Sequence, residues 1–128
     1  MPAINAISLA KLAERFPRLN CLVLIGSRAN GTAQKQSDWD FAYFFDEPDE
    51  FIRLGLAEAL RQQLASIVKC DVDAIDLVDM RSAQLAMRIV IVNDGQLIFC
   101  QKPQFWFKFQ EKTWREHEYW QWEESHAT

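Results

Sequence analysis

The feature that most constrains this chain is a pair of apolar runs whose ends carry small and acidic residues. The first run, residues 21–25, is apolar throughout and ends at Gly26-Ser27. The second run, residues 39–45, is rich in aromatic residues and begins at Asp38-Trp39-Asp40. Short apolar runs bounded by turn residues are typical of buried strands. The sequence therefore predicts two core strands, with a Gly-Ser turn after the first and an Asp-x-Asp pair at the head of the second.

Hydrophobic periodicity and turn residues predict the remaining elements. Helices are expected over residues 4–16, 51–68 and 103–122, and a further helix follows Ser82, which can cap it. Strands are expected over residues 74–78 and 96–100, with a turn at Asn93-Asp94-Gly95. This order of helices and strands predicts an α+β or α/β fold in which a mixed β-sheet is covered by helices.

The Gly-Ser turn and the Asp-x-Asp pair suit the binding of phosphate and metal. Gly26 allows a sharp turn and a close approach to a ligand. The Ser27 hydroxyl and the backbone N–H groups after it can donate to phosphate oxygens. Residues two apart on a strand project to one face, roughly 6.5–7 Å apart. We therefore expect Asp38 and Asp40 to share Mg²⁺, which prefers carboxylate oxygens.

A third carboxylate is expected on a neighbouring strand, and the segment of residues 71–79 offers four aspartates. Strand alternation places Asp76 on the opposite face from Asp73 and Asp79. Asp76 lies in mid-strand between apolar residues, where an unpaired carboxylate would be costly. A metal-binding or proton-transfer role would explain it, whereas Asp71 and Asp79 read as solvated residues at the strand ends.

Each of these motifs is ordinary by itself. A Gly-Ser pair after a strand can be only a turn, and Asp-x-Asp is usually a solvated strand edge. Both motifs at one fixed spacing arise by chance in about a few chains per thousand, given the usual frequencies of Gly, Ser and Asp. Their combination with a mid-strand Asp76 favours a functional site.

These residues resemble a known family. Residues 26–33 and 37–41 closely resemble the nucleotidyltransferase superfamily of DNA polymerase β type, and within it the minimal nucleotidyltransferase (MNT) domains. Residues 75–80 resemble the strand that carries the third carboxylate of that family, and residues 94–99 resemble its last strand. The resemblance implies an α+β nucleotidyltransferase (polymerase β-like) fold. We expect one domain over residues 1–128, with residues 103–122 as an additional C-terminal helix rich in aromatic residues.

The resemblance also implies the composition of the site. Gly26 and Ser27 would contact the triphosphate of ATP, Asp38 and Asp40 would hold two Mg²⁺ ions, and Asp76 would be a third ligand or the general base. An acceptor hydroxyl would attack the α-phosphate in line, with pyrophosphate leaving.

One position departs from the family pattern. Members of the family often carry a basic residue where this chain has Asn30, so another cation would have to contact the phosphates. Arg28 and Lys35 are the candidates, and we assign Arg28 to the nucleotide-binding set. The alternative for both is an ordinary solvated charge on a loop.

The acceptor is expected to be another protein, because a catalytic core of this size with one added helix has no domain to hold a polymer or a drug. MNT proteins of this size resemble the antitoxin of bacterial HEPN/MNT toxin–antitoxin pairs, in which AMP is transferred to a tyrosine of the HEPN toxin. Two alternatives stay open: an MNT protein that inhibits only by binding, and a small-molecule adenylyltransferase. The intact carboxylates argue against the first, and the missing acceptor domain argues against the second.

The segment of residues 105–122 carries eight aromatic side chains, spread around the whole helix. One reading is that half of them pack on the sheet while the others are merely exposed. We expect instead a protein-binding surface, because aromatic residues dominate the centres of interfaces.

Composition excludes several classes of protein. The net charge of -4 gives no general basic surface for direct contact with nucleic acid. No apolar run approaches the ~20 residues of a membrane span, and the first residues do not resemble a signal peptide. The odd number of cysteines, without a C-x-x-C pair, indicates buried reduced thiols and a cytoplasmic location.

Overall fold

The two apolar runs form the centre of a four-stranded sheet in the computed structural model, which describes residues 4–34 and 36–127. The strands are β1 (Leu19–Ile25), β2 (Trp39–Phe45), β3 (Ile75–Asp79) and β4 (Gln96–Cys100), in the order β3-β2-β1-β4. β1 pairs antiparallel with both β2 and β4, whereas β2 pairs parallel with β3. The prediction of a mixed sheet covered by helices is confirmed.

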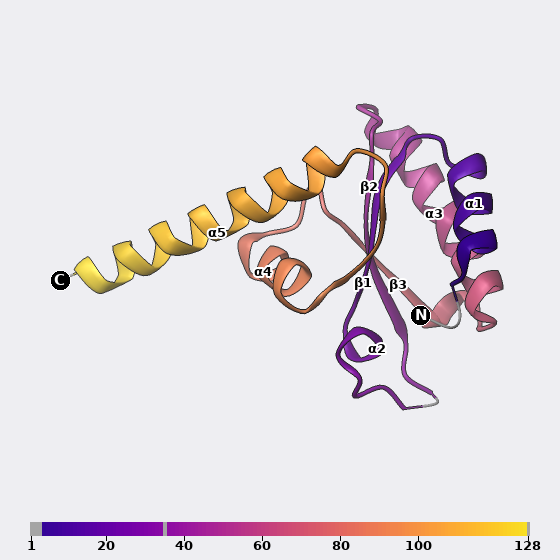
Figure 1. The fold of residues 1–128 in the computed structure, drawn as a ribbon, viewed down its shortest axis with the longest axis horizontal. Helices are drawn as coiled ribbons and strands as arrows, with labels where there is room; N and C mark the ends of the chain where they lie inside the picture. Colours follow the sequence, from indigo (N-terminus) through magenta and orange to yellow (C-terminus); the bar gives the residue numbers. More distant parts are fainter. Residues whose placement is uncertain (1–3, 35, 128) are drawn as a thin grey trace.

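One face of the sheet is covered by α1 (Ala6–Arg15) and α3 (Glu50–Val68), which lie together in Figure 1. Both helices have polar N-caps, because the Asn5 side chain accepts from Ser8 N and the Asp49 side chain accepts from the N–H groups of Phe51 and Ile52. The larger hydrophobic core lies between these helices and the sheet, and its most buried members include Leu12, Leu22, Leu24, Phe41, Phe45, Leu60 and Leu64. Burial of each such side chain contributes about 1.5–3 kcal/mol.

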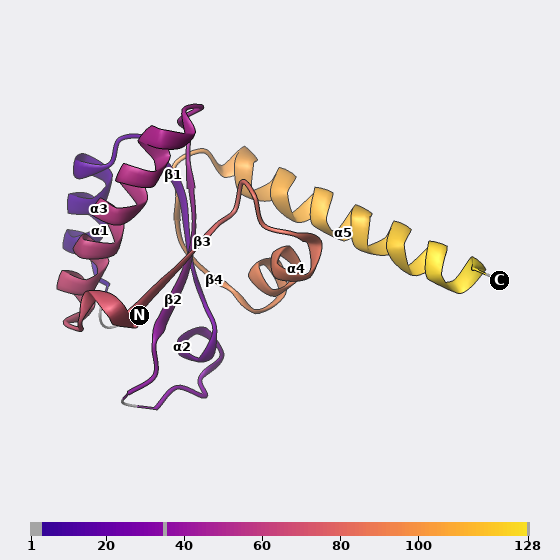
Figure 2. The same ribbon diagram turned by 180° about the vertical axis from the view of Figure 1, so that it is seen from behind.

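The other face is covered by α4 (Leu85–Asp94) and the first half of α5 (Pro103–His126), as Figure 2 shows from behind. A smaller core lies here, built on Cys21, Val23, Ile25, Ala42, Met80 and Ile91. Phe105, Trp106 and Phe109 of α5 pack against it. The second half of α5 extends away from the sheet (Figures 1 and 2).

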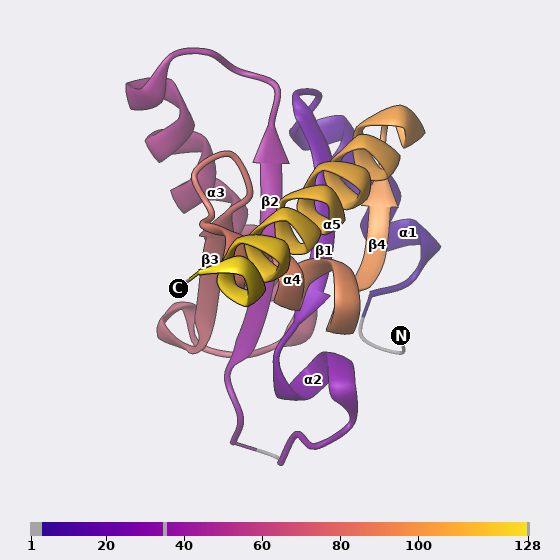
Figure 3. The same cartoon turned by 90° about the vertical axis from the view of Figure 1, so that its left-hand side faces the viewer.

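Two short helical segments lie next to strand ends. α2 (Ser27–Asn30) directly follows β1, and the 3₁₀ helix η1 (Val72–Ala74) leads into β3. Figure 3 shows α2 below the sheet, beside the end of β1 and the beginning of β2. The segment between the two apolar runs therefore contains one short helical turn.

Three details of the predicted elements are wrong. Ser82 does not cap α4, because the helix begins at Leu85 and its N-cap is Gln84. Ser82 lies before that position, in a turn closed by the bond from its N–H to the carbonyl of Asp79. Asn93 and Asp94 belong to the last turn of α4 rather than to a separate turn. α5 continues to His126, beyond the expected end at residue 122.

The three cysteines are free thiols. Cys21 is buried as expected, while Cys70 and Cys100 are only half-buried. Burial is the main cause that raises the pKa of the Cys21 thiol, and the neighbouring Cys100 adds to it. None of the helices in the described part of the chain combines the length and the apolar content needed to cross a bilayer.

Candidate functional site

Gly26 forms the sharp turn at the end of β1, and no other residue would fit there. Its φ is 74° and its ψ is -159°, a conformation that L-residues rarely adopt. A Cβ at this position would overlap Oδ2 of Asp40 and lie 3.2 Å from Cγ of Asp40. The missing side chain therefore leaves room for the Asp40 carboxylate to lie directly against the turn.

Asp40 and Asp76 form a carboxylate pair across two strands. They are register partners on the parallel strands β2 and β3, whose backbones lie roughly 4.8 Å apart. Asp40 lies on the same face of β2 as Ala42, which belongs to the smaller core beneath α4 and α5. Partial burial raises the pKa of Asp40 above its usual value, as do the charge of Asp76, a hydrogen bond with it and the charge of Asp38.

Asp38 lies just outside β2, which begins at Trp39, and its side chain is exposed. It is near enough to Asp40 to raise the pKa of that carboxyl. Within residues 4–34 and 36–127, however, no group of three His, Cys, Asp or Glu side chains is gathered tightly enough to hold a metal ion. The structure thus brings Asp40 and Asp76 together, with Asp38 beside them at the end of the loop.

The chemistry of these donors fits Mg²⁺. The three carboxylates offer only hard oxygen ligands, which Mg²⁺ prefers. Mutual repulsion and partial desolvation already disfavour the negative charge on Asp40. A divalent cation would relieve that repulsion.

α2 is held in place next to the carboxylates by two sets of bonds. The N–H groups of Ala29 and Asn30 bond to the carbonyl of Gly26 at 3.0 and 3.2 Å. Nε2 of Gln96, the first residue of β4, donates to the carbonyl of Ala29 at 2.6 Å. Ser27 is the first residue of α2, where the backbone N–H has no intrahelical partner and can bond to phosphate. The role of Gln96 has no signal in the sequence, because this contact joins residues that are distant in the chain.

Arg28 contacts the loop that leads to Asp38 and stabilises it. Its guanidinium lies over the ring of Trp39, 4.5 Å from the centroid, and its Nη2 donates to the carbonyl of Ser37 at 2.8 Å. Contact between Arg28 and a phosphate stays a prediction. Lys35, the other candidate, lies outside the described residues.

Asp79 has a structural partner of its own. Its Oδ1 accepts a hydrogen bond from the backbone N–H of Arg81 at 2.9 Å. Asp79 is the register partner of Tyr43. Burial, followed by the charge of Asp79, raises the pKa of Tyr43 to about 12. Since Tyr43 belongs to the larger core, Asp79 lies on the opposite face of the sheet from the Asp40 and Asp76 pair.

The aromatic residues of α5 divide along the length of the helix. Phe105, Trp106 and Phe109 pack on the smaller core, whereas Tyr119, Trp120 and Trp122 are each more than half exposed. The helix therefore carries more aromatic surface than this core covers. The protein-binding role of that surface stays a prediction.

Comparison with known proteins gives consistent matches. Residues 8–104 match the family model described as polymerase beta, nucleotidyltransferase. The chain is 30% identical over 106 residues to protein adenylyltransferase MntA of Aphanizomenon flos-aquae, covering 80% of this chain and 71% of that protein. It is 35% identical over 101 residues to protein adenylyltransferase MntA of Shewanella oneidensis, covering 77% of this chain and 68% of that protein.

Two solved structures show the same fold. A toxin–antitoxin structure with AMP-PNP superposes with a TM-score of 0.69 at 31% identity, covering 94% of this chain and 93% of that chain. A complex of the tri-AMPylated Shewanella oneidensis HEPN toxin with its MNT antitoxin gives a TM-score of 0.64 at 28% identity, covering 98% and 93% of the two chains.

Proposed function

Because the chain belongs to the polymerase beta nucleotidyltransferase family, we propose that it is a protein adenylyltransferase that moves AMP from ATP to a HEPN-family toxin. The modification would silence the toxin, so that the chain acts as its antitoxin. The acceptor atom would be a hydroxyl oxygen, most simply that of a tyrosine. Three free thiols and the use of ATP fit a cytoplasmic location.

The single observation that carries this proposal is the arrangement of Gly26, Asp40 and Asp76. A glycine turn lies directly against one carboxylate, and that carboxylate is paired with a second one on the next strand. Relatives that are similar over most of their length are protein adenylyltransferases. The same fold occurs in an antitoxin bound to an AMPylated HEPN toxin.

Each residue of the site has a proposed role. Gly26 and Ser27 bind the triphosphate through backbone N–H groups and the Ser27 hydroxyl. Asp38, Asp40 and Asp76 would hold two Mg²⁺ ions, which when bound neutralise charge on the phosphate oxygens. Arg28 holds the loop before Asp38 in place and can also face the phosphates.

The transfer itself exchanges one P–O bond for another. The acceptor oxygen forms a bond to the α-phosphorus, while the bond from that phosphorus to the pyrophosphate oxygen breaks. A carboxylate oxygen of Asp76 accepts the proton that the acceptor hydroxyl loses. The products are the AMP ester of the partner and pyrophosphate.

A second candidate function is inhibition by binding alone, which the exposed aromatic residues of α5 favour. Labelled ATP separates the two functions. The partner should retain label from the α-phosphate of ATP but none from the γ-phosphate, and Asp40→Asn should abolish the labelling. A partner that is silenced by the wild-type chain without ever retaining the α-label would instead establish inhibition by binding.

A further inference from the structure

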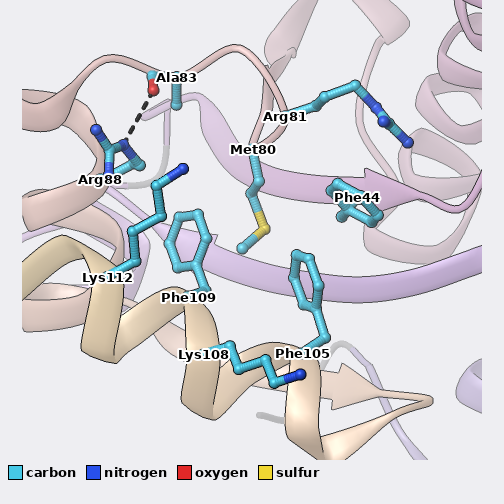
Figure 4. Close-up of a pocket in the computed structure, with 9 residues that line it drawn as sticks. All are labelled: Phe44, Met80, Arg81, Ala83, Arg88, Phe105, Lys108, Phe109 and Lys112. Carbon is cyan, nitrogen blue, oxygen red and sulfur yellow. Dashed lines mark hydrogen bonds between the residues drawn. The ribbon is translucent and has the colours of Figure 1, made fainter. Parts of the chain in front are cut away.

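A cavity of about 340 Å³ lies between the end of β2, the loop before α4 and the first half of α5 (Figure 4). Four large apolar side chains line it, those of Phe44, Met80, Phe105 and Phe109, together with the smaller Ala83. The rings of Phe44 and Phe105 lie against each other, with centroids 4.4 Å apart. Four cationic side chains complete the lining: Arg81, Arg88, Lys108 and Lys112. The cavity thus combines an aromatic floor with a positively charged rim.

Arg88 is a buried cation whose hydrogen bonds are incomplete. Its side chain is only 14% exposed. Nε donates to the carbonyl of Ala83 at 3.2 Å, and Nη2 pairs with Glu116 at 2.5 Å. Nη1 is buried and finds no hydrogen-bond partner in the described part of the chain. A buried donor without an acceptor is costly, so the positive charge of Arg88 is only partly compensated by Glu116 where it lines the cavity.

Lys108 and Lys112 lie one turn apart on the exposed side of α5, where two like charges repel each other. Neither lysine forms an ion pair with any of the described side chains. The nearby glutamates are already engaged, Glu111 with Arg115 and Glu116 with Arg88. The surface around these lysines is therefore positively charged, although the whole chain has a net charge of -4. Such a local positive charge favours binding of an anionic ligand.

The cavity and the catalytic carboxylates lie on one face of the sheet. Phe44 follows Asp40 by four residues on β2, so both side chains point to the face that α4 and α5 cover. Four residues of strand span roughly 13 Å. A single partner protein can therefore occupy the cavity and present a hydroxyl at Asp40.

We propose that this cavity binds an acidic side chain, together with an apolar or aromatic neighbour, on a segment of the protein that receives AMP. The inference rests on the proposed function and names the chemistry by which the acceptor is recognised. The cations bind the carboxylate, and the four apolar side chains pack against its neighbour. Nucleic acid fits less well, because three glutamates of α5 that pair with no cation in the described part of the chain would repel a polyphosphate: Glu118, Glu123 and Glu124.

The test reverses the charge of the rim in the full chain. Lys108→Glu with Lys112→Glu should weaken binding of the HEPN-family toxin partner by about tenfold or more. The KM for the toxin should rise similarly, while kcat at saturating toxin should stay within about twofold. Added salt should weaken binding of the wild-type chain more steeply than binding of the variant.

A matched control changes the net charge by the same amount on the opposite face. Lys11→Glu with Arg15→Glu alters two exposed residues of α1, and the dissociation constant for the toxin should not change. Equal dissociation constants for the two double variants would overturn the inference. It would also be overturned if the rim variant lost binding of a single-stranded RNA oligonucleotide while its affinity for the toxin was unchanged.

The proposed function is judged by a separate readout. A toxin that binds the wild-type chain but never receives AMP would contradict the proposed function. The two double variants would still decide the inference about the cavity, because their dissociation constants do not depend on transfer.

Discussion

Asp40 and Asp76 are direct neighbours across the parallel strands β2 and β3, and this pairing, added to partial burial, raises the pKa of Asp40. Two carboxylates held together in this way favour a shared proton when no cation is bound. With a divalent cation between them, both can be ionised. The pairing of these two strands therefore makes the affinity for a divalent cation depend on pH.

The first prediction concerns pH. Because the pKa of Asp40 is raised in the folded protein, the folded state holds a proton that the unfolded state releases at lower pH. Tighter binding of that proton stabilises the folded state. The stabilisation is fully present below the pKa of an unfolded Asp and is lost as pH rises through the raised pKa of Asp40. Mg²⁺ competes with that proton, so its affinity should increase as pH rises through the raised pKa. Calorimetric titration of Mg²⁺ from about pH 4 to about pH 7, the range in which perturbed carboxyl groups titrate, checks this.

Asp76→Asn provides the control for the pH prediction. Removing the neighbouring charge should lower the pKa of Asp40, so the remaining pH dependence should move to lower pH. NMR titration of the Asp40 carboxyl measures the shift. An unchanged pKa in the variant would show that Asp76 does not act on Asp40.

The second prediction concerns Gly26. Gly26→Ala should reduce AMP transfer by at least about a hundredfold, because the new Cβ would displace the Asp40 carboxylate. The unfavourable φ should also lower the free energy of unfolding by about 1–3 kcal/mol. Gly55→Ala is the matched control, because Gly55 lies in α3 with open space around its Cα. That change should raise stability by about 0.5–1 kcal/mol and leave transfer unaffected. Full transfer by Gly26→Ala would argue against the close approach described here.

The third prediction distinguishes two aspartates of β3. Asp76→Asn should lower kcat by orders of magnitude while the fold survives, because it removes a carboxylate from the shared site. Asp79→Asn should leave kcat nearly unchanged, since an Asn oxygen can still accept from the N–H of Arg81. Steady-state kinetics of the two variants decide the assignment. Equal tolerance of both changes, or greater sensitivity at Asp79, would refute the role of Asp76.

The fourth prediction concerns the loop before Asp38. Arg28→Gln and Trp39→Leu should each reduce transfer, since both remove the contact between the guanidinium and the ring. In a double-mutant cycle the two changes should be coupled by about 0.5–2 kcal/mol in transition-state stabilisation. Strict additivity would mean that Arg28 acts independently of Trp39, as expected if its main contact were with a phosphate.

Much of the site could be predicted from the sequence because its signals are local. The apolar runs predicted β1 and β2. Strand alternation predicted, without any knowledge of the fold, that Asp76 and Asp79 lie on opposite faces of their strand. The glycine turn and the two carboxylates at the start of β2 lie within fifteen residues of one another, from Gly26 to Asp40. Site residues that are this close in the chain form a motif that can be recognised from the sequence alone.

The rest depends on contacts between distant segments. The register that places Asp40 opposite Asp76 depends on the crossover through α3, whose geometry the periodicity does not specify. The bond from Gln96 to Ala29 and the cavity beneath α5 arise only when β4 and α5 pack on the sheet. Ser82 is not the cap of α4 because the turn after β3 extends through it and the helix begins only at Leu85, a boundary that propensity alone does not reveal.

The most direct test of the central claim is the intact mass of the HEPN partner after co-expression with this chain. We expect a mass increase of about 329 Da for each AMP group that is transferred. Co-expression with Asp38→Asn should give the unmodified mass, and the toxin should then remain active. A partner that is unmodified in both cases, and silenced equally by both forms of the chain, would contradict the claim and establish inhibition by binding alone.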